Sequence, residues 1–259
     1  MLNFAQGLLA LIGGYFFYSI AISEGIPFWP ALVLSLIASA LLGALIYVLM
    51  LRPLMGQSAL LLVMLTIALN IVLGAVALML WGGATHFVKA PGAKVDLHLP
   101  GQIRITALDV AVVVLVAILL TAFAIMLRWS SFGSRMRAAA ENPLLATYRG
   151  INVGTVSTAT WAIATVGASM AGIIYGATNG LAPSAGNALG FAAFPAVVLG
   201  GLDSVGGALI GAGILAEVQG FAVSYLGGKY ADVVGYGVLL LVLIVYPTGL
   251  FGSKEIARL

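Results

Sequence analysis

Residues 59–81 read ALLLVMLTIALNIVLGAVALMLW, and this run carries no charged side chain. A helix rises about 1.5 Å per residue, and about 20 apolar residues cross the hydrocarbon core of a bilayer, so the run is long enough to span a membrane. The charge-free interval around it extends over residues 53–88, and a second extends over residues 150–202. Both intervals are longer than one crossing requires. The chain is therefore predicted to be an integral membrane protein.

Composition favours helices over a soluble fold or a membrane barrel. Of the 259 residues, 62% are hydrophobic and 7% are charged, and the mean hydropathy is +1.16. Soluble domains carry charge on roughly a quarter of their residues. A barrel would show segments of about 10 residues with alternating polarity, and that alternation is absent. Helices satisfy their own backbone groups in lipid, and the 33 glycines allow close packing. The predicted fold class is all-α, a polytopic integral membrane helical bundle.

Hydropathy and turn residues divide the chain into about seven full spans within a single transmembrane domain, 1–259. The spans are predicted at residues 7–23, 31–51, 59–81, 106–127, 156–178, 205–226 and 233–248. Residues 185–201 are apolar but too short for a full span, contain Pro195 and end in two glycines. We expect them to form one short discontinuous helix.

Charged and reactive residues restrict the function. The chain has no cysteine, which excludes disulfides, thiolate metal sites and cysteine nucleophiles. The net charge of +3 comes from basic residues scattered over short loops, which indicates orientation signals and not a nucleic-acid surface. His86 and His98 lie among turn residues of one loop, and we interpret both as solvent-exposed. Because the first residues carry no basic stretch or cleavage site, we expect no removable signal peptide.

The basic residues also orient the spans. Positive residues are enriched in cytoplasmic loops. Placing Arg52, the connection 128–149 and the tail inside puts seven basic residues in the cytoplasm, and four then lie outside. The four outer residues are Lys89, Lys94, Arg104 and Lys229. The loop around residues 128–153 is thus predicted to face the cytoplasm.

That loop has an unusual pattern for a membrane connection. Residues Arg135–Glu141 favour a helix, Asn142 can cap a second helix, and Pro143 suits a first helical turn. The second helix is predicted over 143–149, and Gly150 would end it. Lipid requires no such element, whereas a groove on a partner protein would accept one.

Several motifs follow one another along the chain. They are NFAQG (residues 3–7), LRPL (51–54), RAAAEN (137–142) with GIN (150–152), VLGGLDS (198–204) and the closing YPTGLFG (246–252). Their order and spacing resemble those of the permeases of branched-chain amino acid ABC importers, LivH type. The resemblance covers nearly the whole chain. It departs from the family in two ways: members usually have a further hydrophobic segment before the first motif, and Gln6 stands where histidine is frequent.

The resemblance implies a transmembrane permease subunit, not an enzyme, that translocates a small polar solute such as a branched-chain or other amino acid. The implied partners are a second, LivM-like permease subunit, two cytoplasmic ATPase subunits, an extracytoplasmic solute-binding protein and membrane lipid, with no nucleic acid. ATP and Mg²⁺ would bind in the ATPase subunits, since residues 249–254 lack the spacing of a phosphate-binding loop. The implied location is the inner membrane of a bacterium, crossed several times.

The resemblance also makes the loop at about 128–155 the segment that couples the permease to its ATPase. No catalytic, cofactor-binding or metal-binding residue is predicted. The coupling candidates are Arg137, Glu141, Asn142, Pro143, Ala146, Arg149, Gly150 and Ile151.

Polar residues within or beside the spans are candidates for the translocation path. A polar side chain in lipid needs a partner or a water-filled cavity, so each also has a structural interpretation. For Asn70, with Thr66 one turn before it, that interpretation is an interhelical hydrogen bond; for Glu217 it is packing. The N-terminus of the short helix, near Ser184, could meet a substrate carboxylate. The path candidates are Asn3, Gln6, Thr66, Asn70, Asn179, Ser184, Asn187 and Glu217.

Three alternatives remain open. A stand-alone secondary transporter or channel would need no ATPase, but it predicts paired intramembrane carboxylates, which this sequence lacks. Related permeases carry urea, short amides or aromatic acids on the same scaffold. A membrane hydrolase would need a histidine beside a nucleophile or metal, and both histidines lie in one loop.

Overall fold

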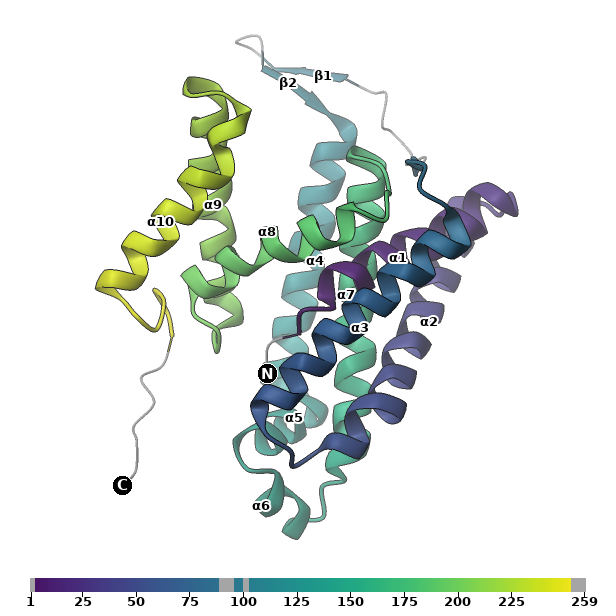
Figure 1. Cartoon of the computed structure of the whole chain (residues 1–259), viewed down its shortest axis with the longest axis vertical. Coiled ribbons are helices and arrows are strands. Elements are labelled where there is room, and N and C mark those ends of the chain that lie inside the picture. The colour runs from purple at the N-terminus through teal and green to yellow at the C-terminus, as the bar shows by residue number, and fades with distance from the viewer. Residues whose placement is uncertain (1–2, 89–95, 100–102, 253–259) are drawn as a thin grey trace. The chain divides into compact units, whose positions relative to one another are not determined.

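The computed structural model describes residues 3–88, 96–99 and 103–252, which are mostly helical (Figure 1). The α-helices are α1 (Gln6–Tyr18), α2 (Phe28–Ile46), α3 (Ala59–Trp81), α4 (Ala107–Trp129), α5 (Ser131–Glu141), α6 (Pro143–Tyr148), α7 (Val153–Thr178), α8 (Ala185–Gly200), α9 (Val205–Tyr225) and α10 (Ala231–Val245). Contacts divide the chain into two compact units, Met1–Asn187 and Ala188–Leu259, which are described separately. The prediction of a single domain, 1–259, stays a prediction.

Seven helical segments of the described chain are long and apolar enough to cross a membrane. They are Gln6–Ser23, Phe28–Leu54, Leu60–Trp81, Ala107–Trp129, Val153–Thr178, Gly206–Tyr225 and Gly228–Val245. The seven predicted spans and the all-α membrane class are confirmed. The first two segments include π-helical turns, Ser19–Ser23 and Tyr47–Leu51, and the second ends in a 3₁₀ turn, Arg52–Leu54. The last begins with another 3₁₀ turn, Gly228–Tyr230.

The short helix and the long loop differ from expectation. Helix α8 is short, as predicted, but it runs unbroken from Ala185 to Gly200 with Pro195 inside it. Proline removes one backbone donor, yet a membrane helix tolerates that loss, so the predicted discontinuity is wrong. In the loop, strands β1 (Asp96–Leu99) and β2 (Ile103–Thr106) form an antiparallel hairpin that sequence analysis did not anticipate.

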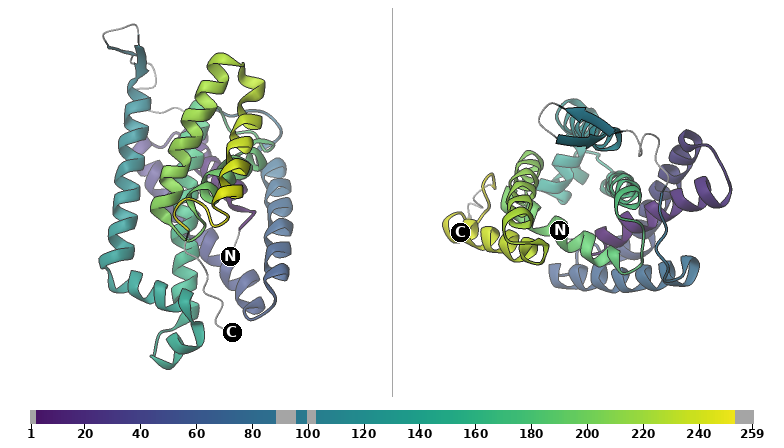
Figure 2. Two further views of the ribbon diagram at one scale, coloured as in Figure 1. Left: turned by 90° about the vertical axis from the view of Figure 1, so that its left-hand side faces the viewer. Right: turned by 90° about the horizontal axis from the view of Figure 1, so that it is seen from above.

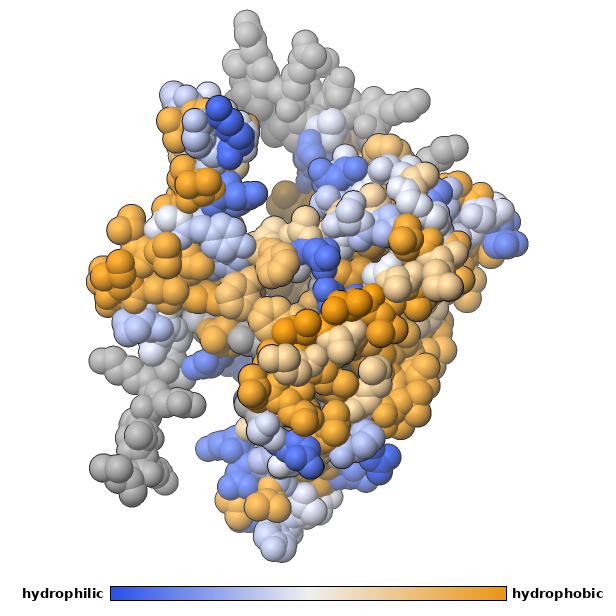
Figure 3. All heavy atoms as spheres, in the orientation of Figure 1, coloured by the Kyte–Doolittle hydropathy of each residue, from blue (hydrophilic) through white to orange (hydrophobic). Residues whose placement is uncertain are grey.

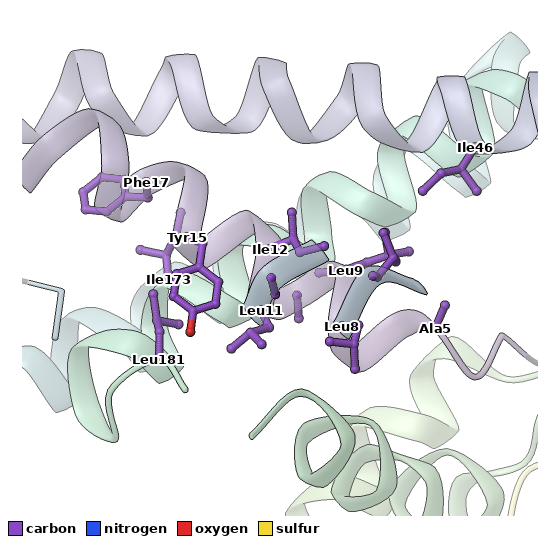
Figure 4. Packing of buried hydrophobic residues seen from close by; sticks show 14 of the residues in the cluster. Ala5, Leu8, Leu9, Leu11, Ile12, Tyr15, Phe17, Ile46, Ile173 and Leu181 are labelled. Carbon is purple, nitrogen blue, oxygen red and sulfur yellow. The ribbon is translucent and has the colours of Figure 1, made fainter. Parts of the chain in front are cut away.

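Helix α1 is the buried centre of the first unit. Its packing partners are chiefly α7 and then α2 and α3. Side chains on all sides of α1 are buried, because Leu8, Leu11, Tyr15 and Phe17 are each at most 1% exposed. Figure 4 shows these residues around α1 and among the neighbouring helices. A uniformly apolar helix suits lipid as well as the inside of a bundle, so the burial of α1 follows from its neighbours and not from its composition.

Glycines let α7 approach α1 and α2 at backbone distance. A Cβ atom on Gly172 of α7 would lie 1.7 Å from the carbonyl oxygen of Ala10 on α1. On α2, a Cβ atom on Gly43 would lie 2.3 Å from Thr165 Oγ1 of α7. Small residues at such contacts are a common means of joining helices in membranes. The first unit therefore has a tightly packed core of α1, α2 and α7.

Two of the buried hydroxyl groups in this core bond to their own helices. Ser39 donates to the carbonyl oxygen of Ser35 at 2.8 Å, and Thr165 donates to that of Trp161 at 2.8 Å. Ser39 and Thr165 are at most 1% exposed. Each hydroxyl is thus satisfied one turn back along its own helix, a usual arrangement for serine and threonine in helices.

His86 is not the exposed loop residue that the sequence predicted. It exchanges backbone hydrogen bonds with Leu181 at 2.9 and 2.7 Å, and this pairing draws the loop against the helices. The imidazole is half-buried, lies 4.6 Å from the Tyr18 ring by centroids, and its Nε2 is 3.0 Å from the Trp81 carbonyl oxygen. The side chain of His98 lies outside the described part of the structure.

In the second unit, two of the family-like motifs meet. The backbone N–H of Leu250 donates to the Leu199 carbonyl at 2.9 Å, and that of Phe251 donates to the Gly200 carbonyl at 3.0 Å. Buried Leu199, Leu215 and Leu239 form its core. The closing motif therefore forms part of the packed end of this unit, against the glycine pair of the VLGGLDS motif.

Different elements lie at the two ends of α4 in the first unit. Figures 1 and 2 place the hairpin at one end of α4 and helices α5 and α6 at the other. Hydrophobic side chains cover the visible face of α2 and α3, and hydrophilic ones gather below them (Figure 3). Such a band is expected for a membrane protein. Lys89, Lys94, Lys254 and Arg258, which enter the orientation prediction, lie outside the described residues.

Replacing Gly172 by alanine should destabilise the first unit, because the new Cβ would collide with the backbone of α1. Overpacking of this kind costs about 1–3 kcal/mol. Gly167→Ala is the matched control in the same helix, because a Cβ atom at Gly167 would meet nothing within 4 Å. Thermal unfolding in detergent should show a lower midpoint for Gly172→Ala and an unchanged or higher one for Gly167→Ala. Equal midpoints would contradict the close contact.

Candidate functional site

An elbow at Ser130 between α4 and α5 leads into the segment that holds the coupling candidates. The Ser130 hydroxyl accepts a hydrogen bond from the Gly133 backbone N–H at 2.9 Å and so caps α5. Arg137 donates through Nη1 to the Leu127 carbonyl and through Nη2 to the Ser134 hydroxyl. The predicted helix at 135–141 is confirmed and begins earlier, at Ser131, because of this cap. These bonds fix the direction in which α5 leaves α4.

Asn142 separates α5 from α6 and caps the second helix. Its backbone is extended, with φ −152° and ψ 101°, and its Oδ1 accepts from the Leu145 N–H at 3.0 Å. Pro143 occupies the first helical position, where its missing N–H costs nothing. Glu141 is the exposed last residue of α5. The capping role that the sequence assigned to Asn142 and Pro143 is confirmed.

Gly150 ends α6 in the manner predicted. Its φ of +78° lies in the left-handed region, which side chains other than glycine rarely adopt. The Gly150 N–H donates to the Thr147 carbonyl at 2.9 Å, and the Ile151 N–H donates to the Ala146 carbonyl at 3.0 Å. This pair of bonds is a Schellman motif. Ala146 is 3% exposed and anchors the motif, and exposed Arg149 caps the helix.

Three apolar side chains on α6 are exposed. Leu144 is 73% exposed, Leu145 61% and Tyr148 86%. Tyr148 stands four residues after Leu144, so the two share a helix face. Sequence analysis did not single these residues out, although two leucines followed by a tyrosine on a capped helix could have indicated a docking surface. A six-residue helix capped at both ends is a rigid support for it.

A second set of candidates forms a polar cluster between α1, α3 and α7. Asn3 Nδ2 donates to Gln6 Oε1 at 3.0 Å, and Gln6 Nε2 donates to the Ala164 carbonyl of α7 at 3.2 Å. Buried Thr66 on α3 accepts from the Phe4 N–H at 3.3 Å. The structure therefore brings Asn3, Gln6 and Thr66 together.

Asn70 lies one turn after Thr66 on the same face of α3. Its Nδ2 donates to Asn187 Oδ1 at 2.7 Å and so joins α3 to the first turn of α8. The Oδ1 atom of Asn70 is buried and has no hydrogen-bond partner among the described residues. The interhelical bond considered for Asn70 is present, and the sequence could not name Asn187 as its partner.

The remaining path candidates do not join this cluster. Asn179 is exposed and donates to the Thr178 hydroxyl at 2.8 Å, Ser184 is exposed, and Glu217 lies exposed on α9 in the second unit. Among the residues described, no group of three or more His, Asp or Glu side chains could hold a metal ion.

Replacing Asn142 by alanine should loosen α6, because the Leu145 N–H would lose its acceptor. Loss of such a cap costs about 1 kcal/mol, which corresponds to about fivefold more frequent local opening. Hydrogen exchange of the peptide 143–149 should accelerate by that factor. Asn142→Asp, which keeps an acceptor at this position, should exchange like the parent chain. Identical exchange in the alanine variant would rule out the cap.

Comparison with known proteins agrees with these features. The family model described as branched-chain amino acid transport system / permease component matches residues 1–243. The chain is 36% identical over 155 residues to the high-affinity branched-chain amino acid transport system permease protein LivH of Salmonella typhimurium and to that of Escherichia coli, covering 60% of this chain and 50% of each relative. It is 30% identical over 275 residues to the corresponding permease protein BraD of Pseudomonas aeruginosa, covering 100% of this chain and 88% of BraD.

The aligned part thus spans about half the length of the LivH proteins and most of BraD. No solved structure matches the chain. The match to the family model over nearly the whole chain agrees with the resemblance carried by the five motifs and with seven helices able to cross a membrane. This multi-pass membrane protein belongs to the family of permease components of branched-chain amino acid transport systems.

Proposed function

We propose that the chain is the permease subunit of an ATP-driven importer of branched-chain or other small amino acids in the inner membrane of a bacterium. The observation that carries the proposal is α6, a short helix capped at both ends that presents Leu144, Leu145 and Tyr148 to solvent. Aromatic and aliphatic side chains on a rigid support are suited to bind a groove on a partner. The names of LivH and BraD supply the solute class.

The chain would work with three kinds of partner. Two ATPase subunits would bind ATP and Mg²⁺ and contact α6, a second permease subunit would complete the path, and an extracytoplasmic binding protein would deliver the amino acid. The chain itself would be a permease and not an enzyme. This arrangement explains why α6 is exposed although it carries apolar side chains.

The contacts of α7 support a mechanical connection between the proposed docking surface and the polar cluster. Helix α7 begins at Val153, three residues after Gly150, with Asn152 as its cap. It contacts the backbone of α1 at Gly172, and its Ala164 carbonyl accepts from Gln6. A displacement of α6 would therefore reach the cluster through α7, because closely packed helices transmit strain.

Uptake by reconstituted vesicles tests the proposal. The chain with its partner permease, ATPases and binding protein should accumulate leucine only when ATP is supplied. Leucine uptake by the chain alone, without an ATPase, would overturn the proposal and favour a stand-alone transporter. Uptake of urea or an aromatic acid in place of leucine would keep the importer and change its substrate.

Replacing Tyr148 or Leu144 by aspartate should weaken binding of the ATPase subunits, because the new carboxylate opposes an apolar contact. Removal of a central interface residue costs about 2 kcal/mol or more, which corresponds to about thirtyfold weaker binding. Co-purification and ATPase stimulation by the loaded binding protein should both fall, while membrane insertion stays normal. Ser131→Ala, on the exposed surface of α5, is the control. Full stimulation in both aspartate variants would exclude this docking surface.

A further inference from the structure

We propose that Asn70 and Asn187 form a closed amide clasp between α3 and α8, and that the clasp opens to give the carbonyl oxygen of Asn70 to the ammonium group of a transported amino acid. The inference rests on the proposed function and assigns a binding group within the path. It follows from two observations on Asn70, its short bond to Asn187 and its unsatisfied oxygen.

The clasp leaves one polar atom without a partner. Nδ2 of Asn70 donates to Oδ1 of Asn187 at 2.7 Å, while Oδ1 of Asn70 is buried and unpaired. Exchanging oxygen and nitrogen in both amides would keep the bond between them and leave the Asn70 nitrogen unpaired instead. The closed pair therefore cannot satisfy the whole Asn70 amide. A buried polar group without a partner is unfavourable. In the orientation with Oδ1 free, a ligand whose donor reaches this oxygen after Asn187 has turned away would therefore stabilise the open state.

Neighbouring groups do not supply that donor. The Thr66 hydroxyl, one turn away, already donates to the Val63 carbonyl at 2.9 Å and accepts from the Phe4 N–H. Asn3 and Gln6 are bonded to each other and to α7. Among the described side chains of this cluster, the oxygen of Asn70 is thus the acceptor without a hydrogen bond.

Contacts beside the clasp set its position. Gly186 precedes Asn187 in the first turn of α8, and a Cβ atom there would lie 2.7 Å from the Leu8 side chain of α1. Leu8 also faces Gly74 of α3, where a Cβ atom would lie 3.8 Å from the Leu8 side chain. Leu8 therefore lies beside both helices that the clasp joins. The side chain of Asn187 is exposed, so it can turn away without disturbing this packing.

Groups on α3 and α8 suit the two opposite charges of an amino acid zwitterion. The carbonyl oxygen on α3 accepts from an ammonium group, and the positive end of the α8 dipole favours the carboxylate of the same molecule. The side chains named around the clasp are uncharged and form no ion pair with the solute. A solute without net charge would therefore bind weakly enough to leave again. An amino acid with an aliphatic side chain fits these requirements.

Reversible cross-linking tests the clasp, because the chain has no cysteine of its own. Asn70→Cys with Asn187→Cys should be joined by a short bifunctional thiosulfonate reagent in the idle complex. The reduced double variant lacks the Asn70 oxygen and should take up leucine slowly, so its own rate is the reference. Cross-linking should abolish this residual uptake, reduction should return it to the reference rate, and turnover with ATP and leucine-loaded binding protein should lower the cross-linking yield. Uptake at the reference rate while cross-linked would overturn the clasp. If the parent complex took up no leucine before any cross-linking, the proposed function would fail first.

Substitution of Asn70 alone tests the contact with the ammonium group. Asn70→Leu should lower the maximal rate of leucine uptake about ten- to hundredfold, the value of a hydrogen bond to a charged group. Asn70→Asp keeps an acceptor and should retain most of the rate. Gln57→Leu is the control, because Gln57 is exposed and is not among the path candidates. A normal rate in Asn70→Leu, or equal losses in the leucine and aspartate variants with normal insertion, would overturn the contact.

Discussion

The contact of α7 with the backbone of α1 is the constraint on which the first unit depends. At Gly172 the two helices are too close to admit even a methyl group. Helix α1 is buried on all sides, and α7 is its main neighbour. Since α7 also follows directly after α6, the buried helix α1 and the exposed apolar side chains of α6 are connected through α7. In the proposed function, the contact that stabilises the unit would also transmit movement.

Hydropathy predicted the spans well because crossing a bilayer is a local requirement. Each span needs only its own apolar residues and its own backbone hydrogen bonds. Contacts between spans were not predictable from this pattern. Nothing in the sequence near Gly172 indicates that its partner is Ala10, and nothing near His86 indicates its pairing with Leu181. The break expected at Pro195 was wrong because a local rule was applied where the surrounding structure decides.

The coupling helix α6 and the pair Asn70–Asn187 also differ in how far they could be predicted from the sequence. The ends of α6 could be predicted from Asn142, Pro143 and Gly150, because caps involve residues three or four positions apart. The clasp could not, since Asn70 and Asn187 are 117 residues apart. Sequence analysis selected both asparagines for being polar in an apolar setting. Only the structure shows that they bind each other and that one acceptor is left over.

The hydroxyl groups that bond back to their own helices have a mechanical consequence. Because Ser39 and Thr165 are already satisfied within α2 and α7, no hydrogen bond of theirs has to break when one helix shifts along another. Dispersion forces, which vary smoothly over small displacements, then resist the shift at these positions. Polar contacts at these two points therefore do not oppose sliding of α2 along α7.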